Sequence, residues 1–536
     1  MSGRARRFGV ALAAAAAVVL VTTSTASATS VTSARDVSLA RRGVSQALQR
    51  HWIQAGDAQR YRGDLSHAMF DISRLPKLRA NIIESQLTQL TTLWDSYTSP
   101  RALALFSQLE ANLAYLETHV IPTSRIDVAG GDGVVYRWFG AHGLEFHPLA
   151  SFGALNAAVA AQDVQTTRTL ADALVARAIP RGPSLLWEYA FRFGFGRPPW
   201  ASGMAQAVAA QALARAGALL QDPNLVTAAA RAYASVQPLV LLLPSGPWVR
   251  LYGFNREIVL NAQLQAIVSL FDYSDATGDA TATALAQQMT ATAQKLLPRF
   301  DTGDWSLYEL GGAYATPEYE LFVTQLLAKL ATRTQDPFWS DAAQRFHGYF
   351  YDPPQIAPIA PTPALYPQPQ DGFLDVAQIP VTLSQNAALS LSVAGQVTTY
   401  RLGRGTHTIT WTPPAGLAPG SYPAQLQATN RAGRSSTVKL GPFVVAWDTT
   451  PPQVAAQLQG STLTWTGNDP GTPWLALKID LVDPNGVNPP QTLDLGQQAP
   501  SGTAQVTIPP GTWHATLEAT NSAGLSTPFD LGVVTA

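Results

Sequence analysis

Hydrophobic residues in the first two thirds of the chain recur with the spacing of helix faces. Leu87, Leu90, Leu93 and Trp94 are three or four positions apart and would form one apolar stripe on a helix. The run from Leu260 to Phe271 has the same spacing, and further runs of this kind follow one another as far as residue 350. The pattern therefore predicts a long series of amphipathic helices.

The ends of these helices carry the expected signals. Pro100 separates the stripe that ends at Trp94 from the next one, which begins at Leu103. Ser202 stands where an N-cap would begin the Ala-rich helix from Met204 to Leu220. Helices of this length joined by short turns pack as antiparallel neighbours, and there are too many for a four-helix bundle. We expect an all-α, incomplete (α/α) toroid over residues 81–352, after a helical or irregular segment at 29–80.

Past residue 360 the pattern changes to alternation. "GSYPAQLQATNRAGRSS" begins at Gly420 and "GTWHATLEATNSAGLST" at Gly511, so the two copies of an internal repeat are 91 residues apart. Each copy predicts a strand followed by an Asn-x-Ala-Gly turn. Two all-β immunoglobulin-like sandwiches are expected at 372–447 and 448–536. The proline-rich segment 353–371 predicts a stiff linker before them.

Three tryptophans fall within the repeats, namely Trp411, Trp465 and Trp513. Packing in the cores of the sandwiches is the expected role, because strand tryptophans bury a large apolar area. A sugar-stacking surface on the sandwiches is the alternative.

The N-terminus has the pattern of a secretory signal peptide. Three arginines, the last of them Arg7, precede an uncharged apolar run from Val10 to Val21, and Ala26–Ala28 offers a small-residue cleavage site. We therefore expect residues 1–28 to be removed and the protein to be secreted, extracellular or at the cell surface. No later stretch approaches the ~20 apolar residues of a membrane-spanning helix.

Composition and charge limit the partners and cofactors that we expect. The chain has no cysteine, so an exported protein of this sequence relies on its core rather than on disulfides. Without the three arginines of the signal peptide, 35 basic residues become 32 against 36 acidic ones, a net charge of −4. Nucleic acid is therefore not an expected partner. There is no metal-binding His or Cys motif and no phosphate-cradling glycine loop, and neither a metal nor a cofactor is expected.

Polar and aromatic residues concentrate at the predicted helix ends, which would surround the mouth of a toroid. Four stretches stand out: "YRWFGAHGLEFHP" from Tyr136, "FGFGRPPWASGMAQ" from Phe193, "WVRLYGFNREIVLN" from Trp248 and "LPRFDTGDWSLYEL" from Leu297. In the last of these, Asp301 and Asp304 are expected to cap the turn.

The region from about Phe146 to Tyr351 resembles the C-terminal domain of the D-glucuronyl C5-epimerase family. "WASGMAQAVA", "IVLNAQLQAIVSLFDYSDATGD" and "LLPRFDTGDWSLYEL" occur in that order with similar spacing. The resemblance implies an isomerase that inverts C5 of glucuronate in an acidic, heparan sulfate-like polysaccharide. It acts by removing and returning a proton, and it needs no cofactor. The resemblance does not extend to the tandem sandwiches.

The resemblance also implies three proton-carrying tyrosines. Tyr308 matches the family pattern without a gap, Tyr252 matches after a one-residue gap, and Tyr319 is the nearest match to the third. Two arginines of the family have no counterpart here, so Arg250 and Arg256 beside Tyr252 are the expected groups for neutralising the sugar carboxylate. Further candidates are Glu257 for catalysis, and Asn261, Trp200, Trp305 and Glu309 for contacts with sugar.

Other functions remain open at this stage. A polysaccharide lyase would begin with the same proton abstraction and then eliminate the C4 substituent. A glycoside hydrolase would need two carboxylates on either side of one bond, for which Glu257 and Glu309 are the candidates. The chain could also be a non-catalytic glycan-binding or cell-surface protein. The sequence is also compatible with a homodimer.

Overall fold

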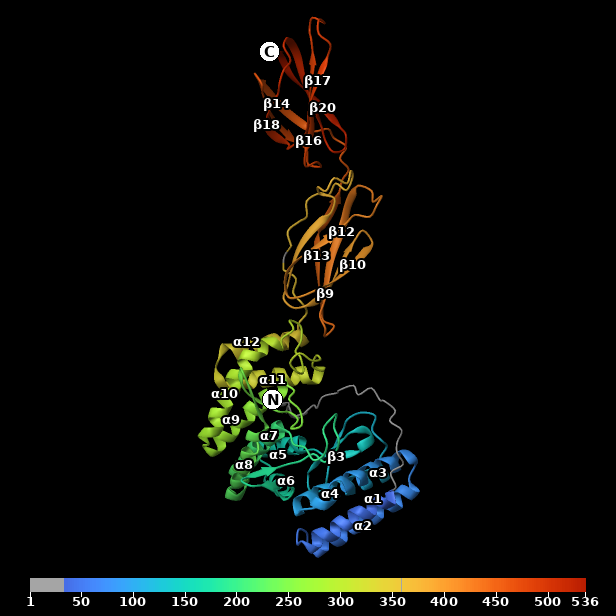
Figure 1. The fold of residues 1–536 in the computed structure, drawn as a ribbon, viewed down its shortest axis with the longest axis vertical. Helices are drawn as coiled ribbons and strands as arrows, with labels where there is room; N and C mark the ends of the chain where they lie inside the picture. The colour runs from blue at the N-terminus through green and yellow to red at the C-terminus, as the bar shows by residue number, and fades with distance from the viewer. Residues whose placement is uncertain (1–32, 358) are drawn as a thin grey trace, which may run out of the picture. The chain divides into compact units, whose positions relative to one another are not determined.

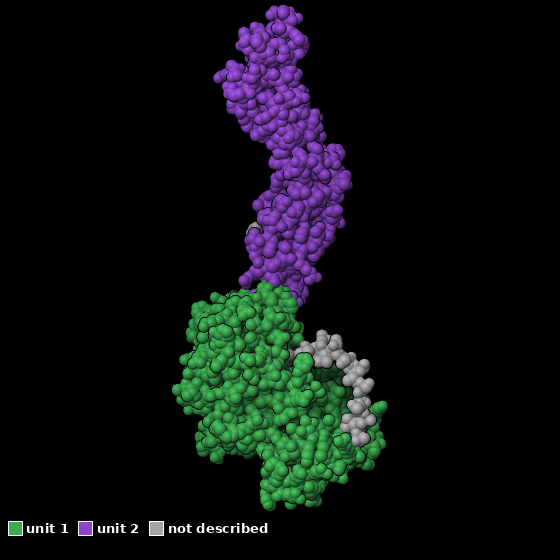
Figure 2. All heavy atoms as spheres, viewed as in Figure 1, with its two compact units in different colours: residues 1–347 green, residues 348–536 purple. Residues whose placement is uncertain are grey.

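The computed structural model describes residues 33–357 and 359–536, which fall into two compact units. The first unit ends at His347 and the second runs from Gly348 to Ala536 (Figure 2). The expected signal peptide at 1–28 lies outside the described residues. Within those residues, no helix is long and apolar enough to cross a membrane. The N-terminal half is helical and the C-terminal region is all-β, as the two hydrophobic patterns predict.

The first unit begins with four helices that pack on one another (Figure 1). They are α1 (Ser33–Gln49), α2 (Ala55–Arg74), α3 (Lys77–Thr92) and α4 (Ser99–Thr118). Helix α1 buries Val37, Ala40, Val44 and Ala47, which are three or four positions apart and so share one face. A small antiparallel sheet follows, with strands β1 (Asp127–Ala129), β2 (Val135–Trp138) and β3 (Leu144–Phe146).

Eight further helices complete the helical part. They are α5 (Pro148–Ala160), α6 (Val164–Ala176), α7 (Gly203–Leu220), α8 (Pro223–Ala234), α9 (Leu260–Thr277), α10 (Ala280–Leu296), α11 (Pro317–Thr334) and α12 (Pro337–Tyr351). Helices α5, α7, α9 and α11 contact one another in that order, while α6, α8 and α10 each pack against the helix before them. Helix α7 is buried on nearly every side, which explains its many alanines. Short side chains let helices approach closely.

Short β-structure precedes the odd-numbered helices from α7 onwards. Hairpin strands β4 (Ile179–Arg181) and β5 (Ser184–Leu186) come before α7, and β6 (Val240–Leu243) and β7 (Gly246–Val249) come before α9. Residues 301–316 form the bridged loop before α11. Short 3₁₀ turns complete this unit: η1 (Trp94–Ser96), η2 (Gly140–His142), η3 (Gln237–Leu239) and η4 (Leu297–Arg299).

A carboxyl group is buried between α3, α4 and β3. Glu145 Oε1 accepts hydrogen bonds from Nε2 of Gln86 at 3.1 Å and of Gln89 at 2.5 Å, while Oε2 is buried without a partner. Gln108 Nε2 ties the two glutamines together at 2.8 and 3.0 Å. Burial raises the pKa of Glu145 well above its ordinary value of 4.5, although the three glutamines oppose the shift. The carboxyl group is therefore neutral at pH values where an exposed glutamate is charged.

Glu145→Gln should remove a pH dependence of stability. A raised pKa in the folded state means that the native protein holds a proton that the unfolded chain releases. The stabilisation is thus complete below pH 4.5 and is lost as pH rises through the folded-state pKa. We expect the variant to match the wild type near pH 5 and to be more stable at pH 8–9 by roughly 1–3 kcal/mol, the cost of a poorly satisfied buried polar group. Urea unfolding from pH 5 to 9 measures it. Parallel pH profiles for both proteins would contradict the account.

The second unit holds two β-domains. The first β-domain has strands β8 (Ala377–Leu383), β9 (Ala387–Val393), β10 (Gln396–Leu402), β11 (Gly405–Trp411), β12 (Gly420–Thr429) and β13 (Ser435–Val445). Its sheets have the orders β10-β9-β12-β13 and β11-β8. The second β-domain has strands β14 (Gln453–Gln459), β15 (Thr462–Asn468), β16 (Leu475–Val482), β17 (Gln491–Gln498), β18 (Ser501–Gln505), β19 (Thr512–Thr520) and β20 (Ser526–Thr535). Its sheets have the orders β17-β16-β19-β20 and β14-β15-β18, so the four-stranded sheet recurs in both copies.

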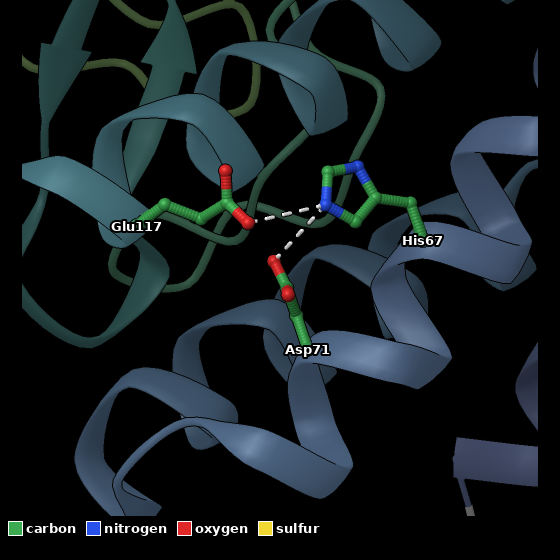
Figure 3. Close-up of side chains that lie close together, drawn as sticks. All are labelled: His67, Asp71 and Glu117. Carbon is green, nitrogen blue, oxygen red and sulfur yellow. Dashed lines mark hydrogen bonds and ion pairs between the residues drawn. The ribbon is translucent and has the colours of Figure 1, made fainter.

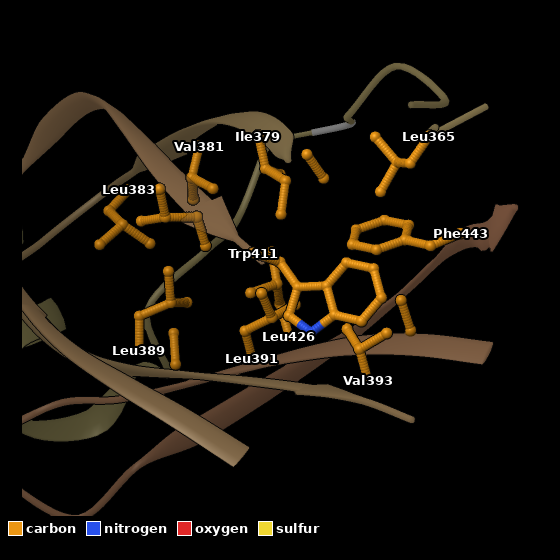
Figure 4. Packing of buried hydrophobic residues seen from close by; sticks show 14 of the residues in the cluster. Leu365, Ile379, Val381, Leu383, Leu389, Leu391, Val393, Trp411, Leu426 and Phe443 are labelled. Atoms are coloured by element: carbon orange, nitrogen blue, oxygen red, sulfur yellow. The ribbon is translucent and has the colours of Figure 1, made fainter. Parts of the chain in front are cut away.

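The strands alternate between buried and exposed residues, as in β8, and their inner faces form the two cores. Trp411 packs among Ile379, Val393 and Phe443 in the first core (Figure 4). Trp465 and Trp513 are buried in the second core. All three tryptophans have an exposed fraction of 3% or less. They are core residues, and the alternative of a sugar-stacking surface built from them is wrong.

The proline-rich segment is attached to the first β-domain. Ala357 N donates to Thr382 O at 3.0 Å, and Leu365 N donates to Val444 O at 2.8 Å. The Leu365 side chain is fully buried in the first core. Proline favours extended backbone, and here the extended segment lies along strand edges instead of standing free as the expected linker.

The Asn-x-Ala-Gly turns have the same role in both copies. Asn430 Nδ2 donates to the carbonyl oxygens of Tyr349 and Asp352, both at 3.1 Å. Asn521 Nδ2 donates to Asp448 Oδ2 at 2.8 Å and to Thr450 O at 3.1 Å. Each turn therefore holds the chain segment that enters its own β-domain.

Candidate functional site

A largely apolar cavity lies where helices α5, α7, α9 and α11 begin. We call it the tyrosine cavity. It is lined by Phe139, His147, Leu149, Tyr189, Phe191, Phe193, Trp200, Ser202, Met204, Leu251, Tyr252, Asn261 and Tyr319. Its volume of about 40 Å³ is far below the ~300 Å³ of a typical small-ligand pocket. A sugar would therefore rest at the mouth and direct its reacting groups inward.

Each of the four helices contributes its first turn. His147 is the N-cap of α5, accepting from Ala150 N at 3.1 Å through Nδ1. Ser202 is the N-cap of α7, accepting from Ala205 N at 3.3 Å, as its sequence position predicts. Asn261 and Tyr319 lie in the first turns of α9 and α11. No acidic residue occupies the first turn of α5, α7 or α9, so no carboxylate within these helices offsets their positive ends, although Glu309 pairs with Val259 at the start of α9.

The loop before α11 fixes Tyr308. Leu260 N, at the start of α9, donates to Tyr308 O at 3.2 Å, and Tyr308 N donates to Ala313 O at 2.9 Å. The loop is further tied by Asp301 Oδ1, which accepts from Gly303 N at 2.9 Å, and by Asp304 Oδ1, which accepts from the Thr302 hydroxyl at 3.0 Å. The two aspartates hold the turn, in agreement with the expectation from sequence.

Glu320 joins this loop to α11. Its Oε2 accepts from the backbone N of Ser306 at 3.0 Å and from the Ser306 hydroxyl. Burial raises the pKa of Glu320 to about 7, against the opposing effect of these hydrogen bonds. Glu320 is therefore a positioning residue for the loop that carries Tyr308.

The three candidate tyrosines come together. The rings of Tyr308 and Tyr319 are 5.0 Å apart between centroids. The hydroxyl of Tyr308 is buried without a well-formed hydrogen bond, yet it is close enough to the hydroxyls of Tyr252 and Tyr319 to lower the pKa of each. Three phenols that are distant in sequence thus share one small polar centre in an apolar surrounding.

Their acidities differ. Burial raises the pKa of Tyr252 to about 12, while its contact with Tyr308 opposes the shift. Burial raises the pKa of Tyr308 and of Tyr319 further, and the neighbouring phenols add to the shift at Tyr308. Tyr252 is therefore the phenol of the three that ionises most readily, and Tyr308 is held neutral.

Positive charge reaches this centre from the β1–β2 region. Arg125, just before β1, lies over the Phe139 ring at 5.3 Å, and its charge lowers the pKa of both Tyr252 and Tyr319. Arg137 on β2 forms a bidentate ion pair with Asp127, in which Nε and Nη2 each donate to a carboxylate oxygen at 2.6 Å. Its Nη1 lies 3.5 Å from His147 Nε2. Burial, together with the charges of Arg137 and Arg125, lowers the pKa of His147 well below its usual range, so the imidazole is neutral.

The remaining sequence candidates divide into two groups. Asn261 is buried and lines the cavity, and its Oδ1 has no partner. Trp200 also lines it, stacked on Tyr189 with ring centroids 4.1 Å apart. Glu257 is exposed and Glu309 half-buried, and the charge of each acts on Tyr252, which places both near the mouth.

Three other candidates lie outside the lining residues of the cavity. Trp305 is a buried core residue whose Nε1 donates to Ala315 O at 2.8 Å. Arg250 folds onto its own loop, where Nη1 donates to Gly253 O at 3.3 Å. Arg256 is exposed. Arg125 is also exposed and outside the lining, but its charge, unlike those of Arg250 and Arg256, is among the main influences on the pKa of Tyr252 and Tyr319.

In the described part of the chain, one group of side chains has the spacing of a metal site: His67, Asp71 and Glu117 (Figure 3). His67 Nε2 is 3.6 Å from Asp71 Oδ2 and 3.4 Å from Glu117 Oε1. Arg74 reaches both carboxylates, at 2.7 and 2.5 Å. Its guanidinium already supplies the positive charge that a metal would bring, so the group is an ion-pair cluster joining α2 to α4.

Part of the helical unit matches a known protein family. The sequence model of the D-glucuronyl C5-epimerase C-terminus matches residues 181–348. These residues are therefore similar to the C-terminal domain of that family. The match confirms the resemblance, although it begins well after Phe146. The matched region contains Tyr252, Tyr308 and Tyr319, whereas Arg125 and His147 precede it.

Other comparisons add little. No curated protein matches the chain significantly. Among solved structures, an endoglucanase from Komagataeibacter sucrofermentans is 15% identical, covering 35% of this chain and 68% of that one, with a TM-score of 0.27. The endo-beta-1,4-glucanase CMCax from Acetobacter xylinum is 17% identical, covering 44% and 77%, with a TM-score of 0.27. The fibronectin(III)-like modules of Clostridium thermocellum CbhA are 16% identical, covering 33% and 90%, with a TM-score of 0.17. At these scores no function is transferred.

Several cavity residues escaped the sequence analysis. Phe139, Tyr189 and Phe191 line it, and Arg125 lies at the Phe139 ring. The stretch "YRWFGAHGLEFHP" was a usable signal for Phe139 and His147, because it packs aromatic and polar residues just before a helix. Arg125 sits in a plain polar segment, "IPTSRID", in which no local pattern points to a site.

Proposed function

We propose that the protein is a cofactor-independent C5-epimerase acting on glucuronate-type residues of an acidic polysaccharide. The observation that carries this proposal is the grouping of three phenols at the tyrosine cavity: Tyr252 and Tyr319 line it, Tyr308 contacts Tyr319, and the charge of Arg125 acts on Tyr252 and Tyr319. Proton removal next to a carboxylate needs a base, an acid and a countercharge, and this group of side chains can supply all three.

The roles follow from the acidities. Tyr252 takes the C5 proton in its ionised form, which is the minor form because burial raises its pKa to about 12, and the electron pair left on C5 spreads into the carboxylate. Tyr308 or Tyr319, both held neutral, then returns a proton to C5 from the other face of the ring. The Tyr252 phenol finally loses its proton to solvent and the donor regains one, so protons balance over the cycle. Arg125 faces the carboxylate, where negative charge builds up.

The helix ends give a second source of stabilisation. Four helices start at the cavity, and three of them have no acidic residue in the first turn. Each N-terminus behaves as a partial positive charge of about half an elementary unit. An anionic intermediate at the mouth would therefore be stabilised by dipoles already oriented before the substrate binds.

Deuterium uptake at C5 tests the proposal. The mature protein is incubated in heavy water with sulfated and unsulfated glucuronate polymers, and the products are examined by proton NMR. We expect deuterium at C5, new iduronate-type signals and an intact chain. Chain shortening with an unsaturated product would make the protein a lyase instead. Absence of exchange with every polymer would leave a glycan-binding role.

The finer structural assignments belong to the same proposal. We interpret helices α5–α12 as four pairs of an incomplete (α/α) toroid, because alternate helices contact one another and their starts share one cavity. We interpret the two β-domains as immunoglobulin-like, from their paired antiparallel sheets. Secretion rests on the N-terminal sequence pattern. It would put the enzyme where extracellular polysaccharides are found.

A further inference from the structure

An aromatic side chain stands fully in solvent beside the tyrosine cavity. Residues 189–200 form a narrow hairpin, which we call the aromatic hairpin. Tyr189 and Trp200 exchange backbone hydrogen bonds at 2.8 and 3.1 Å, and Phe193 and Gly196 do so at 3.2 and 2.8 Å. Tyr189, Phe191, Phe193 and Trp200 line the cavity. At the tip, Phe195 has an exposed fraction of 99%.

The tip is a rigid turn. Gly194 has φ +54° while Phe195 is not left-handed, which is the pattern of a two-residue hairpin turn with glycine first. Below the tip, Gly196 packs so closely on Phe254 that an added Cβ would lie 2.2 Å from its ring. The Phe254 ring in turn contacts Trp200 and Tyr252, with centroids 5.4 and 5.5 Å apart. The backbone next to Phe195 is therefore tied to Tyr252 through Gly196 and Phe254.

Two arginines lie close to Phe195 in the sequence of the aromatic hairpin. Arg192 and Arg197 are both exposed, and neither makes a hydrogen bond, ion pair or ring contact with any other residue in the described ranges of the chain. Single exposed hydrophobic residues are common and need no explanation. Here, however, an aromatic side chain, two unpaired guanidinium groups and a tight turn occur in one short hairpin, with Phe195 two residues after the cavity-lining Phe193.

We propose that Arg192, Phe195 and Arg197 form an outer subsite for an anionic sugar of the polysaccharide. The proposal rests on the proposed function, since it assumes that the neighbouring cavity acts on such a chain. An aromatic face stacks on the apolar face of a sugar ring, and guanidinium groups pair with carboxylate or sulfate. The small cavity alone leaves most of a polymer outside, so the next residues of the chain need a surface of this kind.

Binding measured apart from catalysis tests the subsite. Fluorescein-labelled polymers of glucuronate and N-acetylglucosamine, unsulfated and sulfated, are titrated by fluorescence anisotropy in a Tyr308→Phe background, which is expected not to turn over. Phe195→Ala should weaken binding roughly five- to tenfold, the size of one lost aromatic contact. Phe195→Trp should keep the affinity, whereas Phe195→Leu should not. Arg192→Gln with Arg197→Gln should also flatten the dependence of binding on salt.

The outcomes separate the two proposals. Leu242→Ala, at an exposed position (83%) in the β6 strand, is the matched control and should bind like the parent. If Phe195→Ala or Phe195→Leu binds as tightly as the parent, the outer subsite is overturned while C5 exchange stands untouched. If the wild type neither binds nor exchanges any of the polymers, both proposals fail.

Discussion

Replacing Tyr308 by Phe should reduce C5 deuterium exchange by about 10²–10⁴-fold, the usual contribution of a general acid or base, and leave the fold as stable as before or more so. The stability follows from the position of the hydroxyl, which is buried without a well-formed hydrogen bond. Such a group costs on the order of 1–3 kcal/mol, so its removal relieves the native state. Exchange by NMR and unfolding in urea measure the two effects.

Tyr233→Phe provides the control. Tyr233 is also largely buried, and its hydroxyl accepts from the Thr281 hydroxyl at 3.3 Å, away from the cavity. This variant should lose a little stability and keep its full exchange rate. A purely structural Tyr308 would instead show a loss of stability together with the loss of activity. Equal exchange by Tyr308→Phe and wild type would exclude the hydroxyl from the reaction.

Arg125→Gln should reduce exchange by about 10²–10³-fold, the usual cost of removing one group that stabilises developing negative charge. The effect should depend on the charge of the substrate. A polymer whose glucuronates are methyl-esterified develops one negative charge at this position instead of two, so the variant should lose less activity on it than on the free-acid polymer. Initial rates on both polymers, measured side by side, give the comparison.

Arg256→Gln is the matched control for this experiment, because it removes the same charge at an exposed position outside the cavity lining. It should cost little on either polymer. If Arg256→Gln or Arg250→Gln caused the larger and charge-dependent loss, the carboxylate would lie on the Tyr252 loop, as the sequence first suggested. In that event Arg125 would be a surface residue that happens to lie near the tyrosines.

Most of the secondary structure could be predicted from sequence periodicity, because periodicity reflects which residues are buried. The stripe at Leu260, Leu264 and Phe271 lies on one helix, and the 91-residue repeat recurs as the same four-stranded order in both β-domains. Tyr308 could be singled out because its loop matches the epimerase family pattern without a gap. The proline-rich segment shows the limit of composition. Proline content predicts extended backbone but does not say whether that backbone stands free or lies along a sheet edge.

Which residues make up the site was harder to predict from the sequence, because the site depends on contacts between segments that are distant along the chain. Arg125 reaches the tyrosines only through the packing of the β1–β2 region next to α5, and nothing around it in sequence records this. Arg250 and Arg256 were nominated for their closeness to Tyr252 along the chain. Sequence neighbours on a turning loop point in different directions, so closeness along the chain was a poor guide to closeness in space.

The asparagine of each Asn-x-Ala-Gly turn bears on how such a chain could lengthen over evolution. Asn430 and Asn521 each donate hydrogen bonds to the segment that leads into their own β-domain. A duplicated 91-residue block would bring its own anchor for whatever precedes it, so insertion requires no matching change in the neighbour. Gene duplication could thus add or remove copies of the β-domain without a change in the helical half.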